Sequence, residues 1–100
     1  MKVNFDATMK DLDGKDIPVS DTDGRPITLK LVAIRALTTP IREDENLKGE
    51  EAFKRLELAR KVNAGGEVEL DPADAVLIRD RAPKVWTMVI AGQAYEMLKG

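Results

Sequence analysis

The spacing of apolar residues changes near Thr28. Before it, single apolar residues alternate with Asp, Gly and Pro, a composition typical of short strands and turns. These apolar positions are Val3, Phe5, Leu12, Ile17, Val19 and Ile27. After Thr28 the spacing becomes helical. The pattern predicts one α+β domain over residues 1–100, in which an N-terminal β-hairpin (1–27) packs against about four helices (28–100).

The helical part divides at its caps and breakers. Thr28 is a suitable N-cap for a first helix, which Pro40 ends. A second helix in "EEAFKRLELARKV" ends at Gly65-Gly66, and the alternating "GEVEL" favours a short third strand beside the hairpin. Asp71 and Pro72 start a third helix, Pro83 predicts a break or kink, and "KVWTMVIAGQAYEMLKG" predicts a last helix. The predicted core is Phe5, Leu12, Ile17, Val32, Leu37, Phe53, Leu56, Leu70, Leu77, Ile78, Val85, Val89, Ile90 and Leu98.

The segment "KDLDGKDIPVSDTDGRPITL" repeats Asp-x-Asp-Gly and raises the question of a cation site. A calcium loop needs oxygen ligands at positions 1, 3 and 5, glycine at 6 and an acid at 12. With Gly14 at position 6, Met9 is first and Ser20 last; with Gly24 there, Val19 is first and Lys30 last. Neither register supplies the ligands. We therefore interpret the repeat as two turns, near Gly14 and at Asp23-Gly24, and expect no metal site.

Composition narrows the chemistry further. The 100 residues carry a net charge of −2 and contain no cysteine and no histidine, which excludes thiol nucleophiles, imidazole bases and Cys/His metal sites. The acids Glu43, Asp44 and Glu45 lie in a charged connection, and Glu50 and Glu51 fall where a helix dipole accounts for them. We expect no enzymatic activity and no cofactor. Without a signal-peptide or membrane-spanning pattern, the expected location is cytoplasmic, with no membrane partner.

Two groups of residues are candidates for interaction. Bases near the end of the third helix, together with two on the first helix, have the composition of a phosphate-binding and stacking patch. This patch comprises Lys30, Arg35, Arg79, Arg81, Lys84 and Trp86. The interpretation that we favour places Trp86 in the core and the bases at its rim. Nucleic acid is then a disfavoured partner, although the sequence does not exclude it.

The last helix is apolar around most of its circumference, which favours burial on several sides, either within the domain or against a second copy. Small residues in it would allow close approach of another helix. The candidate homodimer face is Met88, Ala91, Gly92 and Tyr95. Whether Trp86 belongs to the core or to an interface stays open at this point.

The order of "PITLKLVAIRAL", "EEAFKRLELARKV", "VELDPADAVLIRDR" and "GQAYEML" resembles small uncharacterised proteins of tailed phages and prophages. The resemblance assigns no functional residue. It implies a viral protein made in a bacterial host cell that works by binding a host or phage protein, as an inhibitor or a regulatory partner. The alternatives are a nucleic-acid-binding accessory factor and a phage tail or head assembly chaperone.

Overall fold

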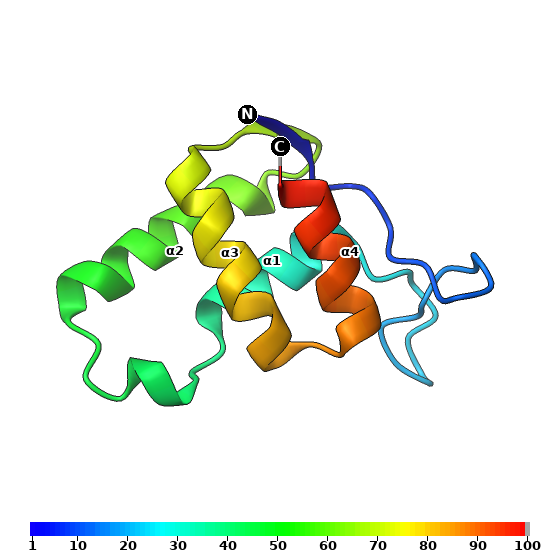
Figure 1. Cartoon of the computed structure of the whole chain (residues 1–100), viewed down its shortest axis with the longest axis horizontal. Coiled ribbons are helices and arrows are strands. Elements are labelled where there is room, and N and C mark those ends of the chain that lie inside the picture. Colours follow the sequence, from blue (N-terminus) through cyan, green and yellow to red (C-terminus); the bar gives the residue numbers. More distant parts are fainter. Residues whose placement is uncertain (100) are drawn as a thin grey trace.

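The computed structural model describes residues 1–99, in which four α-helices pack together and a small sheet lies at one end of them (Figure 1). In chain order the elements are β1 (Lys2–Asn4), α1 (Leu29–Thr38), the 3-10 helix η1 (Arg42–Asp44), α2 (Gly49–Asn63), β2 (Glu67–Glu69), α3 (Pro72–Val85) and α4 (Met88–Leu98). The α+β class expected from the sequence is confirmed.

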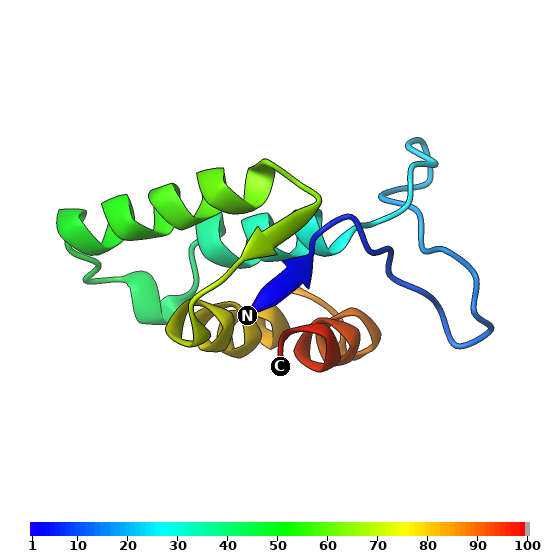
Figure 2. The same ribbon diagram turned by 90° about the horizontal axis from the view of Figure 1, so that it is seen from above.

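The sheet contains two antiparallel strands, β1 and β2, which lie side by side in Figure 2. Val3 pairs with Val68, and both side chains are buried while their neighbours on each strand are exposed. The segment 67–69 is therefore the second strand of the sheet, and a third strand is not formed within residues 1–99. Between β1 and α1 the chain is held by isolated bridges, such as Lys10 to Asp16 and Pro18 to Pro26.

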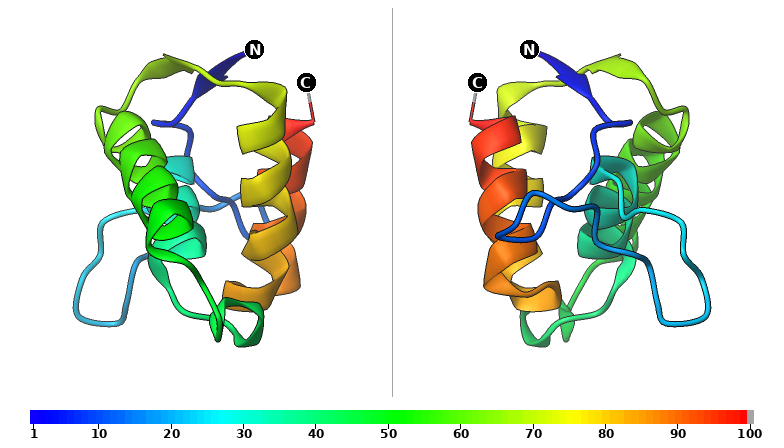
Figure 3. Two further views of the ribbon diagram at one scale, coloured as in Figure 1. Left: turned by 90° about the vertical axis from the view of Figure 1, so that its left-hand side faces the viewer. Right: turned by 90° about the vertical axis from the view of Figure 1, so that its right-hand side faces the viewer.

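Helix α1 lies between α2 on one side and the α3–α4 pair on the other (Figure 3). Thr28 caps it as predicted, because its hydroxyl oxygen accepts a hydrogen bond from the Leu31 N–H at 3.3 Å. Fully buried large side chains from the N-terminal segment and the helices meet around α1. They include Phe5, Met9, Leu29, Val32, Val62, Leu70, Ile78 and Leu98.

Four residues of the predicted core are exposed. Leu12 is 92% exposed, Phe53 is 59% exposed, and Leu56 and Val89 are also on the surface. In α2 the buried face is Leu58, Ala59 and Val62, and in the N-terminal half of the helix the inward position is taken by Arg55. The apolar spacing of α2 therefore marked the wrong face there.

The predicted break at Pro83 is also wrong. Pro83 lies inside α3, which continues to Val85. Proline so near a helix end removes only one backbone hydrogen bond, and the last turn is still closed by the Trp86 N–H, which donates to the Ala82 carbonyl at 2.8 Å. Helix α4 then begins at Met88 and buries a single face of Ile90, Ala91, Ala94 and Leu98. Within the domain it is therefore not buried on several sides.

Candidate functional site

The basic residues that the sequence suggested as one interaction patch are divided among different surroundings. Arg81 is only 5% exposed, so it cannot contact a partner without unfolding its environment. Its Nε donates to the Ala36 carbonyl at 2.6 Å and its Nη2 to the Thr39 carbonyl at 3.0 Å. These carbonyls belong to the last turn and the C-cap of α1, where a helix leaves its carbonyls unpaired.

Asp44 completes this buried cluster. Its carboxylate accepts from both Nη atoms of Arg81, at 2.9 and 2.8 Å, and from Nη1 of Arg55 at 2.6 Å. It also accepts from the Ile41 N–H at 3.0 Å. Hydrogen bonds from Arg81, aided by those from Arg55 and Ile41, hold the pKa of Asp44 well below its usual range, although burial opposes the shift. The cluster joins α1, η1, α2 and α3 and has a structural role.

The sequence contained a signal for the burial of Arg81. Arg81 follows the buried Ile78 by three residues and precedes the buried Ala82, so it lies on the inner face of α3. An arginine at such a position needs an acid partner, and Asp44 lies in the segment interpreted as an exposed connection. What the sequence could not supply is that this connection folds back against α3.

The other members of the patch have different surroundings, and the structure brings Lys30, Arg35 and Trp86 together. Lys84 forms an exposed ion pair with Glu43. The Arg79 guanidinium lies 5.1 Å from the centroid of the Tyr95 ring, between α3 and α4. Arg35 lies 5.5 Å from the centroid of the Trp86 ring, and Arg35 and Lys30 line one hollow of about 490 Å³ together with Arg25. The bases therefore do not form one continuous surface.

Trp86 is half-buried and packs against the core. Its Nε1–H donates to the Val32 carbonyl at 3.1 Å, while Arg35 shields the ring from solvent. This environment agrees with the interpretation of Trp86 as a core residue with a basic rim.

The candidate dimer face is only partly exposed. Ala91 is buried, so it is not available to a second copy, whereas Met88 is 91% exposed and Gly92 and Tyr95 also face solvent. Met88 is the first residue of α4, and its neighbour Val89 is 37% exposed. The exposure of Met88 next to the exposed Val89 is unusual for two large apolar residues and suggests an interaction site.

The turn at residues 11–15 brings a further apolar residue to the same place. The Gly14 N–H donates to the Asp11 carbonyl at 3.0 Å, and the Asp11 N–H donates to the Lys15 carbonyl at 2.8 Å. Gly14 has a φ of 81°, as expected for a three-residue hairpin loop with a left-handed residue at its end. The turn near Gly14 is thus confirmed, but it is not the two-residue type I′ turn, and it places Leu12 at the tip.

The aspartates of both repeats serve these turns. One carboxylate oxygen of Asp11 accepts from the Asp13 and Lys15 N–H groups, at 2.9 and 3.0 Å. In the second turn, Asp23 accepts from the Arg25 N–H at 3.1 Å, and the hydrogen bonds from Arg25 lower the pKa of Asp23 to about 2. The interpretation of the repeat as turns is confirmed.

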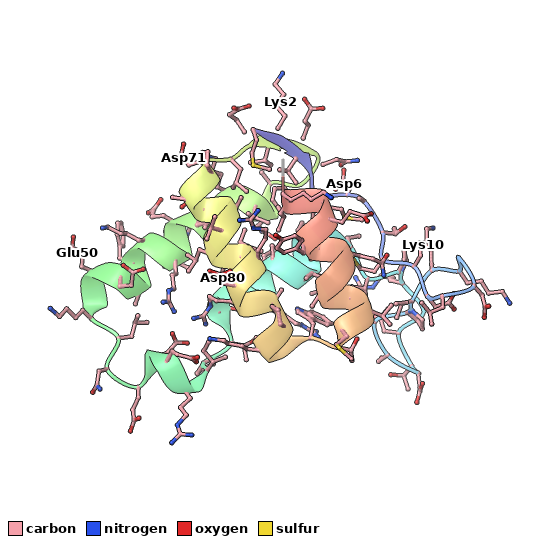
Figure 4. All side chains as sticks on the ribbon, in the orientation of Figure 1. Lys2, Asp6, Lys10, Glu50, Asp71 and Asp80 are labelled. Carbon is pink, nitrogen blue, oxygen red and sulfur yellow. The ribbon has the colours of Figure 1, made fainter. Side chains whose placement is uncertain are left out.

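Gln93 of α4 fixes the first turn to the helix. Its Oε1 accepts from the Lys10 N–H at 2.8 Å, and its Nε2 donates to the Lys10 carbonyl at 2.6 Å. The amide thus pairs with Lys10 much as a neighbouring strand would. Figure 4 shows Lys10 on the loop beside α4, with Glu50 at the far end of α2. No pattern in the sequence indicated this contact between residues 83 positions apart.

Leu12 and Val89 both line two open hollows of about 410 and 450 Å³. The first hollow is also lined by Gly92, Gln93 and Glu96, and the second by Asp13, Ile17 and Pro18. We use the name Leu12–Val89 surface for the exposed apolar residues Leu12, Val89 and Gly92, which line these hollows, together with the exposed Met88, which precedes Val89 in α4 but lines neither hollow. Reasoning from the sequence named Met88 and Gly92 as part of a dimer face, but it missed Leu12 and Val89 because it placed them in the core.

Within residues 1–99, no group of three or more acids is arranged to hold a metal ion, and no helix is long and apolar enough to cross a membrane. Glu50 and Glu51 lie in the first turn of α2, where Glu51 and Arg55 approach to 3.7 Å. Comparisons with protein-family models, curated proteins and solved structures find no match to this chain. Arguments about function therefore depend on the residues themselves.

Proposed function

We propose that this chain is a phage-derived, non-enzymatic protein that acts by binding another protein through the Leu12–Val89 surface. The observation that carries the proposal is that Leu12, which is 92% exposed, and the exposed Val89 line the same two hollows, while Met88, which precedes Val89 in α4, is 91% exposed. Contiguous apolar residues left on a soluble protein commonly mark interaction sites.

Leu12 is presented by a well-defined turn. Two hydrogen bonds between Gln93 and the backbone of Lys10 hold the turn, and Met9 beside Lys10 is fully buried. Because the backbone of the turn is already held, it loses little conformational freedom when a partner covers Leu12, which favours affinity. Burying Leu12 and Met88 would contribute about 1.5–3 kcal/mol each, which the isolated fold leaves unused.

The alternative of nucleic-acid binding has less support. Arg81 is paired with Asp44, Lys84 with Glu43, and Arg79 lies against Tyr95, so Lys30 and Arg35 are the bases of the patch that share a hollow. Phosphate binding depends on several bases acting together. A role as inhibitor, regulator or assembly chaperone agrees with an apolar protein-binding surface.

The proposal is tested by capture from a bacterial lysate on three immobilised proteins. These are the wild type, the double variant Leu12→Ser/Met88→Ser, and the matched double variant Phe53→Ser/Leu56→Ser, which removes exposed apolar residues from α2 instead. We expect the same partner on the wild type and the α2 variant and its loss from Leu12→Ser/Met88→Ser. Equal capture by all three proteins, or loss only with the α2 variant, would contradict the proposal.

A further inference from the structure

We infer that the partner segment covering the Leu12–Val89 surface is basic and amphipathic: a helix or extended stretch with apolar anchors flanked by Lys or Arg. This inference rests on the proposed function and specifies the class of its partner. Its observation is the charge around the two hollows, whose linings contain four acids and one base.

The acids are Asp11, Asp13, Asp16 and Glu96, and the base is Lys10. Lys10 forms an ion pair with Asp16, so these two charges compensate each other. Among the ion pairs of residues 1–99, none involves Asp11, Asp13 or Glu96. Lys15 adds one positive charge in the turn but lines neither hollow.

The same charges disfavour a second copy of this chain as the occupant. In a two-fold symmetric dimer a surface meets itself, so the unpaired acids of one copy would face those of the other. Like charges brought together at an interface oppose binding, whereas a positively charged partner gains both attraction and faster association. The chain as a whole is only slightly acidic, at −2, so the local acidity around this surface is not a general property of the protein.

The shape of the surface fits anchors on one face of a helix. Asp11, Leu12 and Val89 line both hollows, so the two hollows are neighbours. Apolar side chains of a partner at positions i and i+3 or i+4 project on the same side, and one could enter each hollow. Bases on the flanks of such a segment would lie over Asp13 on one side and Glu96 on the other.

The test uses three synthetic helical peptides with the same leucine pattern. All remaining positions are lysine in the first peptide (Leu/Lys), glutamine in the second (Leu/Gln) and glutamate in the third (Leu/Glu). Binding to the full-length protein is measured by calorimetry and located by amide chemical shifts. We expect the Leu/Lys peptide to bind most tightly, to shift the amides of residues 10–16 and 88–96, and to weaken as salt increases. We expect the Leu/Glu peptide not to bind.

A charge-matched pair of variants separates local attraction from net charge. The triple variant Asp11→Asn/Asp13→Asn/Glu96→Gln removes the acids at the surface, and the amide introduced by Asp11→Asn keeps an oxygen that can accept the turn hydrogen bonds. The control Glu45→Gln/Glu50→Gln/Asp71→Asn removes three exposed acids elsewhere. We expect about a tenfold loss of Leu/Lys affinity in the first and about twofold or less in the control.

The inference is overturned if the Leu/Lys peptide shifts other residues, if both triple variants weaken it equally, or if the Leu/Gln peptide binds equally well. It is overturned too if no peptide binds, or if the protein dimerises through residues 88–92. Partner capture that depends on Leu12 and Met88 would still support the proposed function in each case. Loss of that dependence would instead remove the proposed function, whatever the peptides do.

Discussion

The end of the molecule that contains η1 and the end that contains the 11–15 turn differ in which side chains they bury and which they expose. At the first, Arg81 is buried, Asp44 is partly buried, and both oxygens of the Asp44 carboxylate are hydrogen-bonded. At the second, Leu12 and Met88 face solvent. Charges inside and apolar residues outside reverse the usual arrangement. Burial of Arg81 beside Asp44 stabilises the fold, because their hydrogen bonds join four elements. Exposure of Leu12 and Met88 has no such role in the fold.

The largest effect should follow from Arg81→Met. Removing Arg81 takes two of the four hydrogen-bond donors from the Asp44 carboxylate, and it removes the donors that Arg81 supplies to the carbonyls of Ala36 and Thr39. We expect the free energy of unfolding to fall by about 3–5 kcal/mol in a denaturant titration. The control Lys84→Met breaks the exposed pair with Glu43 and should cost less than about 1 kcal/mol. Equal losses in the two variants would mean that the cluster at Asp44 contributes no more to stability than the exposed ion pair does.

The same cluster makes stability depend on pH. Because the pKa of Asp44 is lowered in the folded state, its contribution is present above its unfolded pKa of about 3.9 and is lost as pH falls below that value. We expect the free energy of unfolding of the wild type to decrease between about pH 4 and pH 2. Asp44→Asn should be less stable at pH 7 and decrease less steeply over that range. An unchanged slope in Asp44→Asn would assign the pH dependence to other carboxyl groups.

At the other end, Gln93→Ala should release the turn. It removes the two hydrogen bonds to the Lys10 backbone, so we expect a loss of about 1–2 kcal/mol in stability. Amide hydrogen exchange at Lys10 should become faster. Glu96→Ala, one turn further along α4, should leave that exchange rate unchanged. Unaltered exchange in Gln93→Ala would show that the turn is held by something other than Gln93.

The smallest effect on stability is expected for Leu12→Ser. The side chain is 92% exposed, so the free energy of unfolding should change by less than about 0.5 kcal/mol. Ile90→Ala, two residues after Met88 on the buried face of α4, should cost about 2–5 kcal/mol when measured in the same way. A large loss for Leu12→Ser would show that the residue supports the fold and would weaken the contrast between the two ends.

Local signals in the sequence predicted the fold class and most element boundaries. Thr28 and Pro72 marked helix starts correctly, and the Asp-Gly pair at residue 14 marked a turn. Predictions failed where contacts distant in sequence decide the outcome. Leu12 counted as core because it is apolar, and Arg81 counted as surface because it is charged. Only the folded arrangement reveals that α4 fixes the turn and that η1 covers α3.

Site-specific photocrosslinking tests the central claim most directly, namely that the Leu12–Val89 surface serves binding. A photoreactive phenylalanine analogue would replace Leu12 in one protein and Phe53, the exposed aromatic residue of α2, in another. After irradiation in a bacterial lysate, we expect a discrete crosslinked product from position 12 and none from position 53. Excess wild-type protein without the photoreactive residue should prevent formation of this product. No product from position 12 that wild-type protein prevents, or equal products from both positions, would contradict the claim.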